Sequence, residues 1–456
     1  MTIPWLKSLR GKRAIFAFTA TLGATVLVLP ASAANAGPVD ALPAQPPGTT
    51  QLVSATPDGH AVGGAVPAMS DNGRYVAFLS DGTDLGGAGP APGASIAQVY
   101  VRDLDTGVTT LVSQSPGGEP GNKESEAVRI SGDGRFVAFS SLATNLTTGP
   151  FHKHVNVFVR DLSTGMTTLL TPRDEGHSGH GRTFLSDISP DGRFVGYTSN
   201  ASDLVVPDHN RRSDVFVYDQ TTGETSLISR DLSGRPAGGE SSGPKFSADG
   251  TVIVFTSYAH GLVAEKTDGL GDVYSFDTST GQTTLISRDA KGKPAGRGSR
   301  VADVSADGTR VVFTSYSKHM IAGVTSPNTT ENVYVYDATD GTTTLVNHRP
   351  DGGFVKGENR GVHISADGTL VVFSSNSPLL VDGDGGSFYD VFGYDVATKT
   401  ISLLSQTPDG DFPAGFSMNP DVSADGQYVA FQSQASDLLP GHGAGTEWNV
   451  YVYRMP

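Results

Sequence analysis

Residues 364–374 read Ile-Ser-Ala-Asp-Gly-Thr-Leu-Val-Val-Phe-Ser. An Asp-Gly pair here follows an apolar residue and a serine, and it precedes a run of apolar and β-branched residues that ends in serine. Asp-Gly at such a position is a strong hairpin signal, because glycine adopts the positive φ of a tight turn without steric cost. The stretch therefore predicts two antiparallel strands joined by a short turn.

The same stretch recurs along the chain. Its serine has seven copies at intervals of 58 to 61 residues: Ser70, Ser131, Ser189, Ser247, Ser305, Ser365 and Ser423. A nearly fixed period of this size indicates a repeat architecture, in which each repeat is one supersecondary unit.

Each repeat carries four strand signals, which we label A to D. In the fifth repeat they are 301–305, 310–315, 332–337 and 343–346. Four-stranded sheets repeated radially make a β-propeller. The expected fold is therefore all-β: a seven-bladed β-propeller with four-stranded antiparallel blades.

The two ends of the repeat region predict how the ring closes. The last repeat ends after its strand C, at 449–453, and the first residues of the repeat region, 49–54, match a strand D that has no A, B or C before it. We therefore expect the N-terminal strand to complete the seventh blade, which would also remove two exposed sheet edges. The propeller domain is predicted to span 49–456.

The segment before the propeller resembles a secretory signal followed by a linker. Residues 1–36 combine a basic start, an apolar stretch at 14–29 and small-residue cleavage options after Ala33 or Ala36. An uncleaved membrane anchor is the alternative interpretation. Residues 37–48 contain four prolines and are predicted to be a flexible linker. The protein is thus expected to be secreted, either extracellular or in the cell envelope, with no membrane insertion after cleavage.

Composition narrows the partner classes. The chain has no cysteine, so an exported form must be stabilised by its core rather than by disulfides. Its net charge of −15 argues against nucleic acid and anionic lipid as partners, because like charges repel. Cations, basic peptides and neutral sugars remain compatible with such a surface.

The repeat resembles a known family. The segments Ser365-Ala-Asp-Gly-x-x-Val-Val-Phe-x-Ser, Asp390-Val-Phe-x-Tyr-Asp and Thr221-x-Gly-x-Thr-x-Leu-Ile-Ser are similar to the TolB-type (WD40-like) β-propeller repeat. Ser189-Pro-Asp-Gly is the copy most similar to it. The resemblance covers 49–456 and implies a propeller of a secreted bacterial member of that family.

The first candidate site is a register of charges in strand A. The residue before the last apolar residue of that strand is ionisable in six of seven repeats: Arg129, Asp187, Lys245, Asp303, His363 and Asp421, with Ala68 in the first repeat. Strand A is innermost in a propeller blade, so these side chains are expected near the central channel. They could form pairs between neighbouring blades (Arg129–Asp187, Lys245–Asp303, His363–Asp421) or line a polar channel for an ion or small ligand.

Two further candidates are metal sites in the B–C and D–A loops. Oxygen-bearing side chains beside glycine suit calcium, and two loops supply them: Asp382, Asp384 and Asp390 in one, Asp208, Asn210 and Asp214 in the other. Capping of the loop before strand C would explain the same residues. A histidine cluster in the second repeat could hold zinc or another transition metal: His152, His154, His177 and His180.

Two functional hypotheses follow. The A–B and C–D turns are short and uniform, which indicates a structural role, whereas the B–C and D–A loops vary and are the expected binding face. No His-Glu-x-x-His motif is present, and the one Gly-x-Ser-x-Gly match, at 239–243, has its serine at a repeat position where other repeats also carry serine. We therefore expect a monomeric, non-catalytic binding or scaffold protein for a protein or cell-envelope partner. The alternative is an extracellular metal-assisted lyase or hydrolase acting on a sugar or peptide, whose residues would be scattered across blades.

Overall fold

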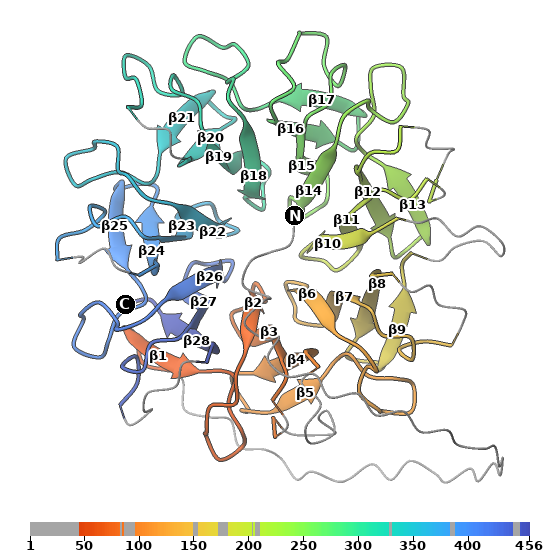
Figure 1. Cartoon of the computed structure of the whole chain (residues 1–456), viewed down its shortest axis with the longest axis vertical. Coiled ribbons are helices and arrows are strands. Elements are labelled where there is room, and N and C mark those ends of the chain that lie inside the picture. The colour runs from red at the N-terminus through yellow and green to blue at the C-terminus, as the bar shows by residue number, and fades with distance from the viewer. Residues whose placement is uncertain are drawn as a thin grey trace, which may run out of the picture.

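The described part of the chain is a ring of seven sheets around a central channel. The computed structural model describes residues 45–82, 84–85, 96–148, 154–171, 181–202, 204–205, 210–327, 331–383, 388–440 and 447–456. Each sheet has four antiparallel strands, with the first strand of each blade facing the centre (Figure 1). The predicted seven-bladed propeller is confirmed. Within the described ranges no helix is long and apolar enough to cross a membrane. The predicted signal peptide and residues 37–44 of the linker lie outside these ranges.

The strands follow the chain blade by blade. From the channel outward, the blades are β2 (Ala65–Met69), β3 (Tyr75–Ser80), β4 (Gln98–Asp103) and β5 (Thr109–Leu111); β6 (Ser125–Ile130), β7 (Phe136–Ser141), β8 (Asn156–Asp161) and β9 (Met166–Leu169); β10 (Thr183–Ile188), β11 (Phe194–Ser199), β12 (Asp214–Asp219) and β13 (Glu224–Leu227); β14 (Ser241–Phe246), β15 (Val252–Ser257), β16 (Asp272–Asp277) and β17 (Gln282–Leu285); β18 (Ser299–Val304), β19 (Arg310–Ser315), β20 (Asn332–Asp337) and β21 (Thr342–Leu345); β22 (Asn359–Ile364), β23 (Leu370–Ser375), β24 (Asp390–Asp395) and β25 (Thr400–Leu403); and β26 (Ser417–Val422), β27 (Tyr428–Ser433), β28 (Asn449–Arg454) and β1 (Thr49–Leu52).

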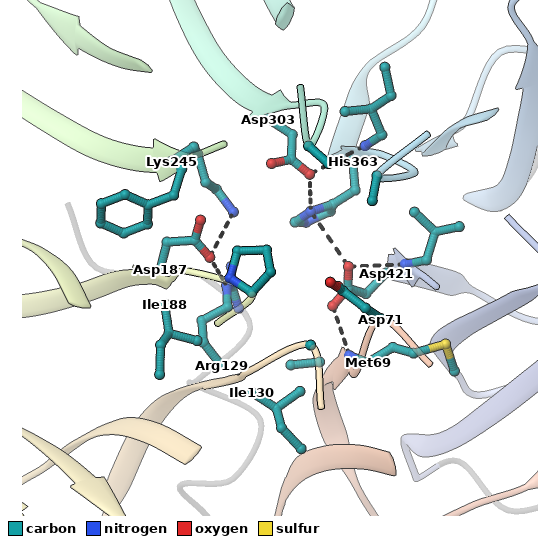
Figure 2. Close-up of a pocket in the computed structure, with 18 of the residues that line it drawn as sticks. Met69, Asp71, Arg129, Ile130, Asp187, Ile188, Lys245, Asp303, His363 and Asp421 are labelled. Carbon is teal, nitrogen blue, oxygen red and sulfur yellow. Dashed lines mark hydrogen bonds and ion pairs between the residues drawn. The ribbon is translucent and has the colours of Figure 1, made fainter. Parts of the chain in front are cut away.

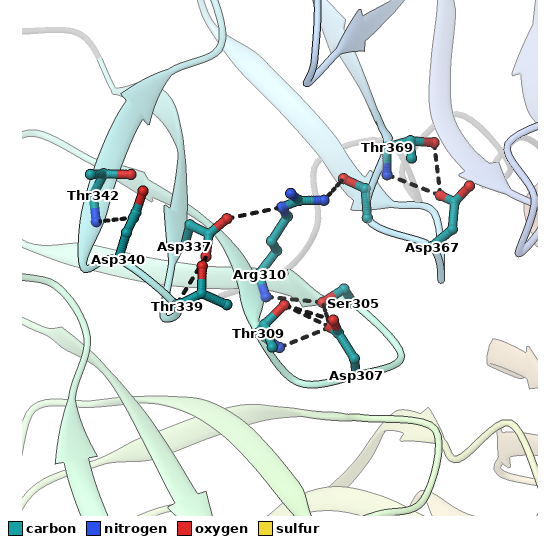
Figure 3. Close-up of polar contacts among 11 residues, drawn as sticks. Ser305, Asp307, Thr309, Arg310, Asp337, Thr339, Asp340, Thr342, Asp367 and Thr369 are labelled. Carbon is teal, nitrogen blue, oxygen red and sulfur yellow. Dashed lines mark hydrogen bonds and ion pairs between the residues drawn. The ribbon is translucent and has the colours of Figure 1, made fainter.

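Hydrogen bonds of the repeated serine explain the turn between strands A and B. In the fifth blade, the Ser305 hydroxyl donates to Asp307 at 2.6 Å and accepts the Arg310 amide at 2.9 Å (Figure 3). Asp307 also accepts the Thr309 amide at 2.9 Å. Because the serine side chain takes the place of a backbone partner, it ends strand A. The observed strand, β18, therefore begins and ends earlier than the predicted 301–305.

The A–B turns also join neighbouring blades. The Ala306 amide donates to the Ala366 carbonyl of the next blade at 2.8 Å, and the Ala424 amide closes the series by donating to the Asp71 backbone carbonyl at 2.9 Å. Arg310 adds a side-chain link, pairing with Asp337 of its own blade at 3.2 Å and donating to the Gly368 carbonyl of the next at 3.1 Å (Figure 3). Pro190 has no amide hydrogen, so the third blade cannot make the same bond to the fourth.

The hydrophobic core lies between blades rather than within one sheet. Strands B and C are buried on both faces, as in β19 and β20. An aromatic pair crosses these two strands in each blade; Phe313 and Tyr334 stack with ring centroids 5.8 Å apart, and both are fully buried. Such close packing holds the inner strands, and therefore the channel lining, in fixed positions.

The ring closes through the N-terminal strand, as predicted. β1 pairs antiparallel with β28, from Thr49 opposite Arg454 to Leu52 opposite Tyr451. A polar pair that recurs in the other blades is completed here by distant residues: the Ser54 hydroxyl donates to Asn449 at 3.2 Å and accepts the Val450 amide at 2.9 Å. The pairing extends into the predicted linker, where the Gly48 amide donates to the Arg454 carbonyl at 2.8 Å.

Candidate functional site

The charge register is positioned by β-bulges. All seven strand A–strand B pairs contain a register shift, and in six blades the shift ends at the register residue itself, as at Asp187 and Lys245. A bulge turns the following side chain away from the regular alternation of the strand. In several blades an amide that the bulge leaves without a partner in its own sheet donates to the neighbouring blade. The Leu185 amide, for example, donates to the Ser140 hydroxyl at 3.0 Å. The register side chains consequently face the channel.

One half of the register is organised around Asp187. Its carboxylate lies 3.8 Å from Arg129 Nε and 3.7 Å from Lys245 Nζ, so two cations from adjacent blades share it (Figure 2). Lys245 was expected to pair with Asp303 of the next blade, but its ion pair is with Asp187. The Lys245 residue is only 8% exposed, so this pair is the main compensation for a buried ammonium group.

The other half is organised around His363. Its Nδ1 lies 3.1 Å from Asp303 and 3.7 Å from Asp421, which brings the sixth blade between the carboxylates of the fifth and seventh (Figure 2). Asp421 also accepts the Met69 amide at 2.9 Å. That contact links the seventh blade to the first, where Ala68 offers no charged partner. The register therefore forms two networks of short contacts, one centred on Asp187 and one on His363, rather than three separate pairs.

The two buried carboxylates titrate in opposite directions. Burial alone would raise the pKa of Asp303, but Lys245 and the hydrogen-bonded His363 outweigh it and lower the pKa to about 2. Burial dominates at Asp187 and raises its pKa, although Lys245 opposes the change. The difference has a geometric cause, because Asp303 also accepts the Val304 amide at 3.0 Å whereas the cations near Asp187 are at least 3.7 Å away.

Asp71 is a further member of this site that the sequence-based reasoning missed. It belongs to the A–B turn of the first blade and, with A–B turn residues of other blades and the register residues, lines a cavity of about 100 Å³ (Figure 2). The other repeats have only Gly, Pro or Ala at this turn position. A lone ionisable residue among small ones was the available signal. The A–B turn of the first blade thus contributes a side chain to the channel lining, in addition to its role as a turn.

The environment of Asp71 disfavours its charge. Burial, followed by the carboxylates of Asp421, Asp187 and Asp303, raises the pKa of Asp71 to about 6 from an ordinary value of 3.8. A carboxyl group with a raised pKa binds its proton more tightly in the folded state than in the unfolded state. Its contribution to stability is therefore lost as pH rises from about 4 through about 6.

We expect Asp71→Asn to stabilise the protein in a pH-dependent way. At pH 7.5 the free energy of unfolding of the variant should be about 1–2 kcal/mol higher, because the substitution removes a disfavoured charge. Solvent in the cavity keeps this gain below the value that the full pKa shift would give. Near pH 4 the gain should almost vanish. Urea unfolding at both pH values measures it, with Asp105→Asn as the control at a carboxylate that is 60% exposed. Equal gains at the two pH values would contradict the assignment.

A second cavity lies at the other end of the register, toward the B–C and D–A loops. It has a volume of about 290 Å³, and Arg129, Lys245 and His363 line both cavities. The outer part of this wide cavity is formed by the fifth and sixth blades, with Arg300, Thr314, Glu331, Asn359 and Arg360 among its lining residues. Arg300 and Arg360 occupy the same position, three residues before the register. An arginine at this position in two consecutive repeats is the sequence signal that would have indicated them.

Aromatic side chains lie beside charged residues that line the wide cavity: Tyr258 next to Arg300, Tyr316 next to Glu331 and Tyr389 against Arg360. We call Tyr258, Tyr316, Phe388, Tyr389 and Phe416 the aromatic rim. Tyr316, Phe388 and Phe416 are each 36% exposed. Phe388 and Phe416 meet edge to face at 5.0 Å, and Arg360 lies 5.1 Å from the centre of the Tyr389 ring. The Tyr389 hydroxyl donates to Glu358 at 2.6 Å, and burial followed by that bond raises the pKa of Tyr389 to about 12.

The proposed calcium ligands have structural contacts where they are described. Asp214 is fully buried and accepts the Ser229 hydroxyl at 2.7 Å, and Asp390 accepts the Ser405 hydroxyl at 3.2 Å. The Asn210 amide group donates to Asp214 at 2.8 Å. These contacts match the capping alternative, because the same pair joins strands C and D in the other blades. Asp382 is exposed, while Asp208 and Asp384 lie outside the described residues, so a calcium site in these loops stays a prediction.

The histidine cluster is only partly visible. His154 is described and half-buried, and its carbonyl accepts the Asn156 side chain at 2.9 Å. His152, His177 and His180 lie outside the described residues. Among the residues that can be described, no three His, Asp or Glu side chains are grouped to hold a metal ion.

Known structures share the propeller fold with this chain. Oligogalacturonate lyase from Vibrio parahaemolyticus has a TM-score of 0.50 and 15% identity, covering 87% of this chain and 91% of that one. The β-propeller domain of the Trilobed protease from Pyrococcus furiosus has a TM-score of 0.51 and 14% identity, covering 86% and 95%. TolB from Acinetobacter baumannii has a TM-score of 0.40 and 16% identity, covering 78% and 75%. No protein-family model and no curated protein matches the chain.

Proposed function

We propose that this chain is a secreted, non-catalytic binding protein that acts as a monomer and uses the B–C and D–A loop face to hold a protein or cell-envelope partner. The observation that carries the proposal is the aromatic rim beside the wide cavity. A rim of exposed aromatic side chains next to an open polar cavity has the composition of a recognition surface. Membership of the TolB-type repeat family, which the repeat motif suggests, would agree with such a role.

The residue types in the aromatic rim and the contacts between them favour a binding surface over an ordinary solvent-exposed surface. Tyrosine and arginine are the residue types that most often dominate binding energy at interfaces, because they combine a large apolar area with polar ends. Here Arg360 lies over Tyr389, and Tyr389 is tied to Glu358 at 2.6 Å. These contacts hold the rim in place before a partner arrives, which reduces the entropy lost on binding.

The proposal is tested by capture of components from a cell-envelope fraction on the immobilised mature protein. The double substitution Tyr389→Ala and Phe416→Ala should weaken capture at least about tenfold, since loss of two anchors costs about 2 kcal/mol or more. The matched control is Met166→Ala with Val108→Ala, at side chains that are 68% and 45% exposed in the first two blades. Equal capture by both double variants would overturn the proposal.

The alternative, a metal-assisted lyase or hydrolase acting on a sugar or peptide, predicts different results. It requires a metal that copurifies with the protein and a captured ligand that is returned shortened. Elemental analysis of the purified protein and mass spectrometry of the ligand after incubation, with and without EDTA, separate the two functions. Product formation that EDTA abolishes would replace the binding proposal with the enzyme.

A further inference from the structure

The wide cavity carries the opposite charge from the protein as a whole. The chain has a net charge of −15. The charged residues lining the cavity are, by contrast, Arg129, Lys245, Arg300, Arg360, Glu331 and His363. Four permanent cations therefore face one carboxylate. A concave site lined mainly by one sign of charge concentrates ligands of the other sign.

Part of this positive charge is already balanced within the protein. Arg129 and Lys245 share Asp187 at 3.8 and 3.7 Å, and Arg360 pairs with Glu358 at 2.8 Å. His363 lies between Asp303 and Asp421. Arg300 differs, because it forms no ion pair with any carboxylate that the structure describes, although, against the effect of its burial, the nearby Tyr258 phenol and the Glu331 charge raise its pKa. Arg300 is thus the cation with capacity left for a ligand.

Lys245 provides a second unused donor at the inner wall. The residue is 8% exposed and lines the cavity, yet its ammonium group makes only the 3.7 Å ion pair with Asp187 and no hydrogen bond to a described residue. An ammonium group carries three N–H donors. An acceptor entering from the cavity would satisfy it.

At several positions that line this cavity, the fifth and sixth blades differ from the equivalent positions in the other blades. In the fourth blade the Thr256 hydroxyl accepts a bulge amide from the next blade, Val301, at 2.9 Å. In the fifth blade the equivalent Thr314 hydroxyl instead donates to Glu331 at 2.6 Å. The next bulge residue is Gly361, with φ 55° and no side chain to occupy the channel. Asn359, where five other blades have Ser or Thr, leaves its Oδ1 without a partner.

We propose that the wide cavity binds a small ligand through a carboxylate, which Arg300 and Arg360 receive at the mouth while Lys245 supplies a donor deeper in the channel. This inference rests on the proposed binding function and specifies its ligand class. A guanidinium group matches a planar carboxylate with two parallel hydrogen bonds. Glu331 in the same lining disfavours a doubly charged phosphate, because the second charge would be repelled.

Two sources of the same carboxylate can be compared directly. Glucuronate represents a sugar acid, and N-acetylphenylalanine represents the carboxyl end of a peptide. Their neutral counterparts are glucose and N-acetylphenylalanine amide, and inorganic phosphate tests other anions. Isothermal titration of the mature protein with each probe at low ionic strength measures the binding constant. We expect at least one acid to bind with its affinity falling as salt is added, and its neutral counterpart to bind at least about tenfold more weakly.

Variants then locate the interaction. Arg300→Gln should weaken binding of the preferred acid at least about tenfold, and Arg300→Lys should restore part of it, since the charge returns without the planar fork. Arg349→Gln, at an arginine that is 44% exposed and outside the cavity lining, should leave binding unchanged. Equal affinity for acid and neutral probes, tighter binding of phosphate, no binding up to about 10 mM, or wild-type affinity in Arg300→Gln would overturn the inference.

The same experiment separates this inference from the proposed function. If the rim substitutions abolish envelope capture while no carboxylate binds, the binding function stands and the ligand class is wrong. If a carboxylate binds but capture is equal in all variants, the cavity site stands and the envelope partner is wrong.

Discussion

A chain that begins at Ala55 is expected to lose much of its thermal stability, because it lacks the strand that closes the ring. β1 supplies the outer strand of the seventh blade, and the side chains of Leu52 at its end and Val53 directly after it are buried. Burial of each contributes about 1.5–3 kcal/mol, and the truncation also exposes an open edge on β28. We expect the unfolding midpoint to fall by about 5–10 °C, as measured by differential scanning calorimetry.

The matched control for this truncation is a chain that begins at Gln45, which keeps every β1 contact and should unfold at the temperature of the mature protein. Ser54→Ala tests the same junction without a deletion, by removing the bonds to Asn449 and Val450. It should cost about 1–2 kcal/mol. A synthetic peptide of residues 45–56 should partly restore the shorter chain, since an extended peptide can add a strand to an open edge. An unchanged midpoint for the chain starting at Ala55 would contradict this account of closure.

The second large effect is expected at Lys245. Replacing Lys245 by methionine removes one of two cations from Asp187 and leaves that carboxylate with only Arg129, at 3.8 Å. Removing one partner of a buried ion pair costs about 3–5 kcal/mol. Because Arg129 still compensates part of the Asp187 charge, we expect a loss of about 3 kcal/mol in free energy of unfolding, at the lower end of that range. Because burial already raises the pKa of Asp187, the loss should shrink as pH is lowered until Asp187 takes up a proton. Urea unfolding over a pH series measures both effects.

A double-mutant cycle isolates the pair itself. Asp187→Asn in the Lys245→Met background should recover part of the stability, with a coupling energy of at least about 1 kcal/mol. Arg349 and Asp351 form a control pair 3.2 Å apart, with side chains 44% and 66% exposed. The equivalent cycle there should give a coupling of less than about 1 kcal/mol. Similar coupling at the two pairs would show that burial of Lys245 adds nothing.

The architecture was predictable because its causes are local and repeated. Each A–B turn needs only its own serine, aspartate and glycine, as the Ser305 contacts show. Strands B and C were predicted with the observed bounds in the fifth blade, β19 and β20. The ends of strands A and D were off by one or two residues, because the bulge and the serine bond set them. The closing strand was evident because residues 49–54 match a unit that is missing at the other end.

The site was predictable only in part. The charge register predicted six residues that all line the cavity of about 100 Å³ beside Asp71: Arg129, Asp187, Lys245, Asp303, His363 and Asp421. Which of these residues form ion pairs depends on how close their side chains come to one another in the channel. Lys245 pairs with Asp187, and His363 lies between Asp303 and Asp421. Asp71, Arg300 and Arg360 were missed, because each is distinguished only by comparison with the equivalent position in the other blades.

The sequence by itself determined the number of blades, the order of strands and the partner of the N-terminal strand. These depend on turn chemistry, on alternation within a few residues and on a period that is visible in the chain. The tertiary structure alone decided which charges meet in the channel and where the channel widens. Residues about 60 apart in sequence, such as Asp303 and His363, come within 3.1 Å there, and their pKa values and free donors depend on burial that only the closed ring creates.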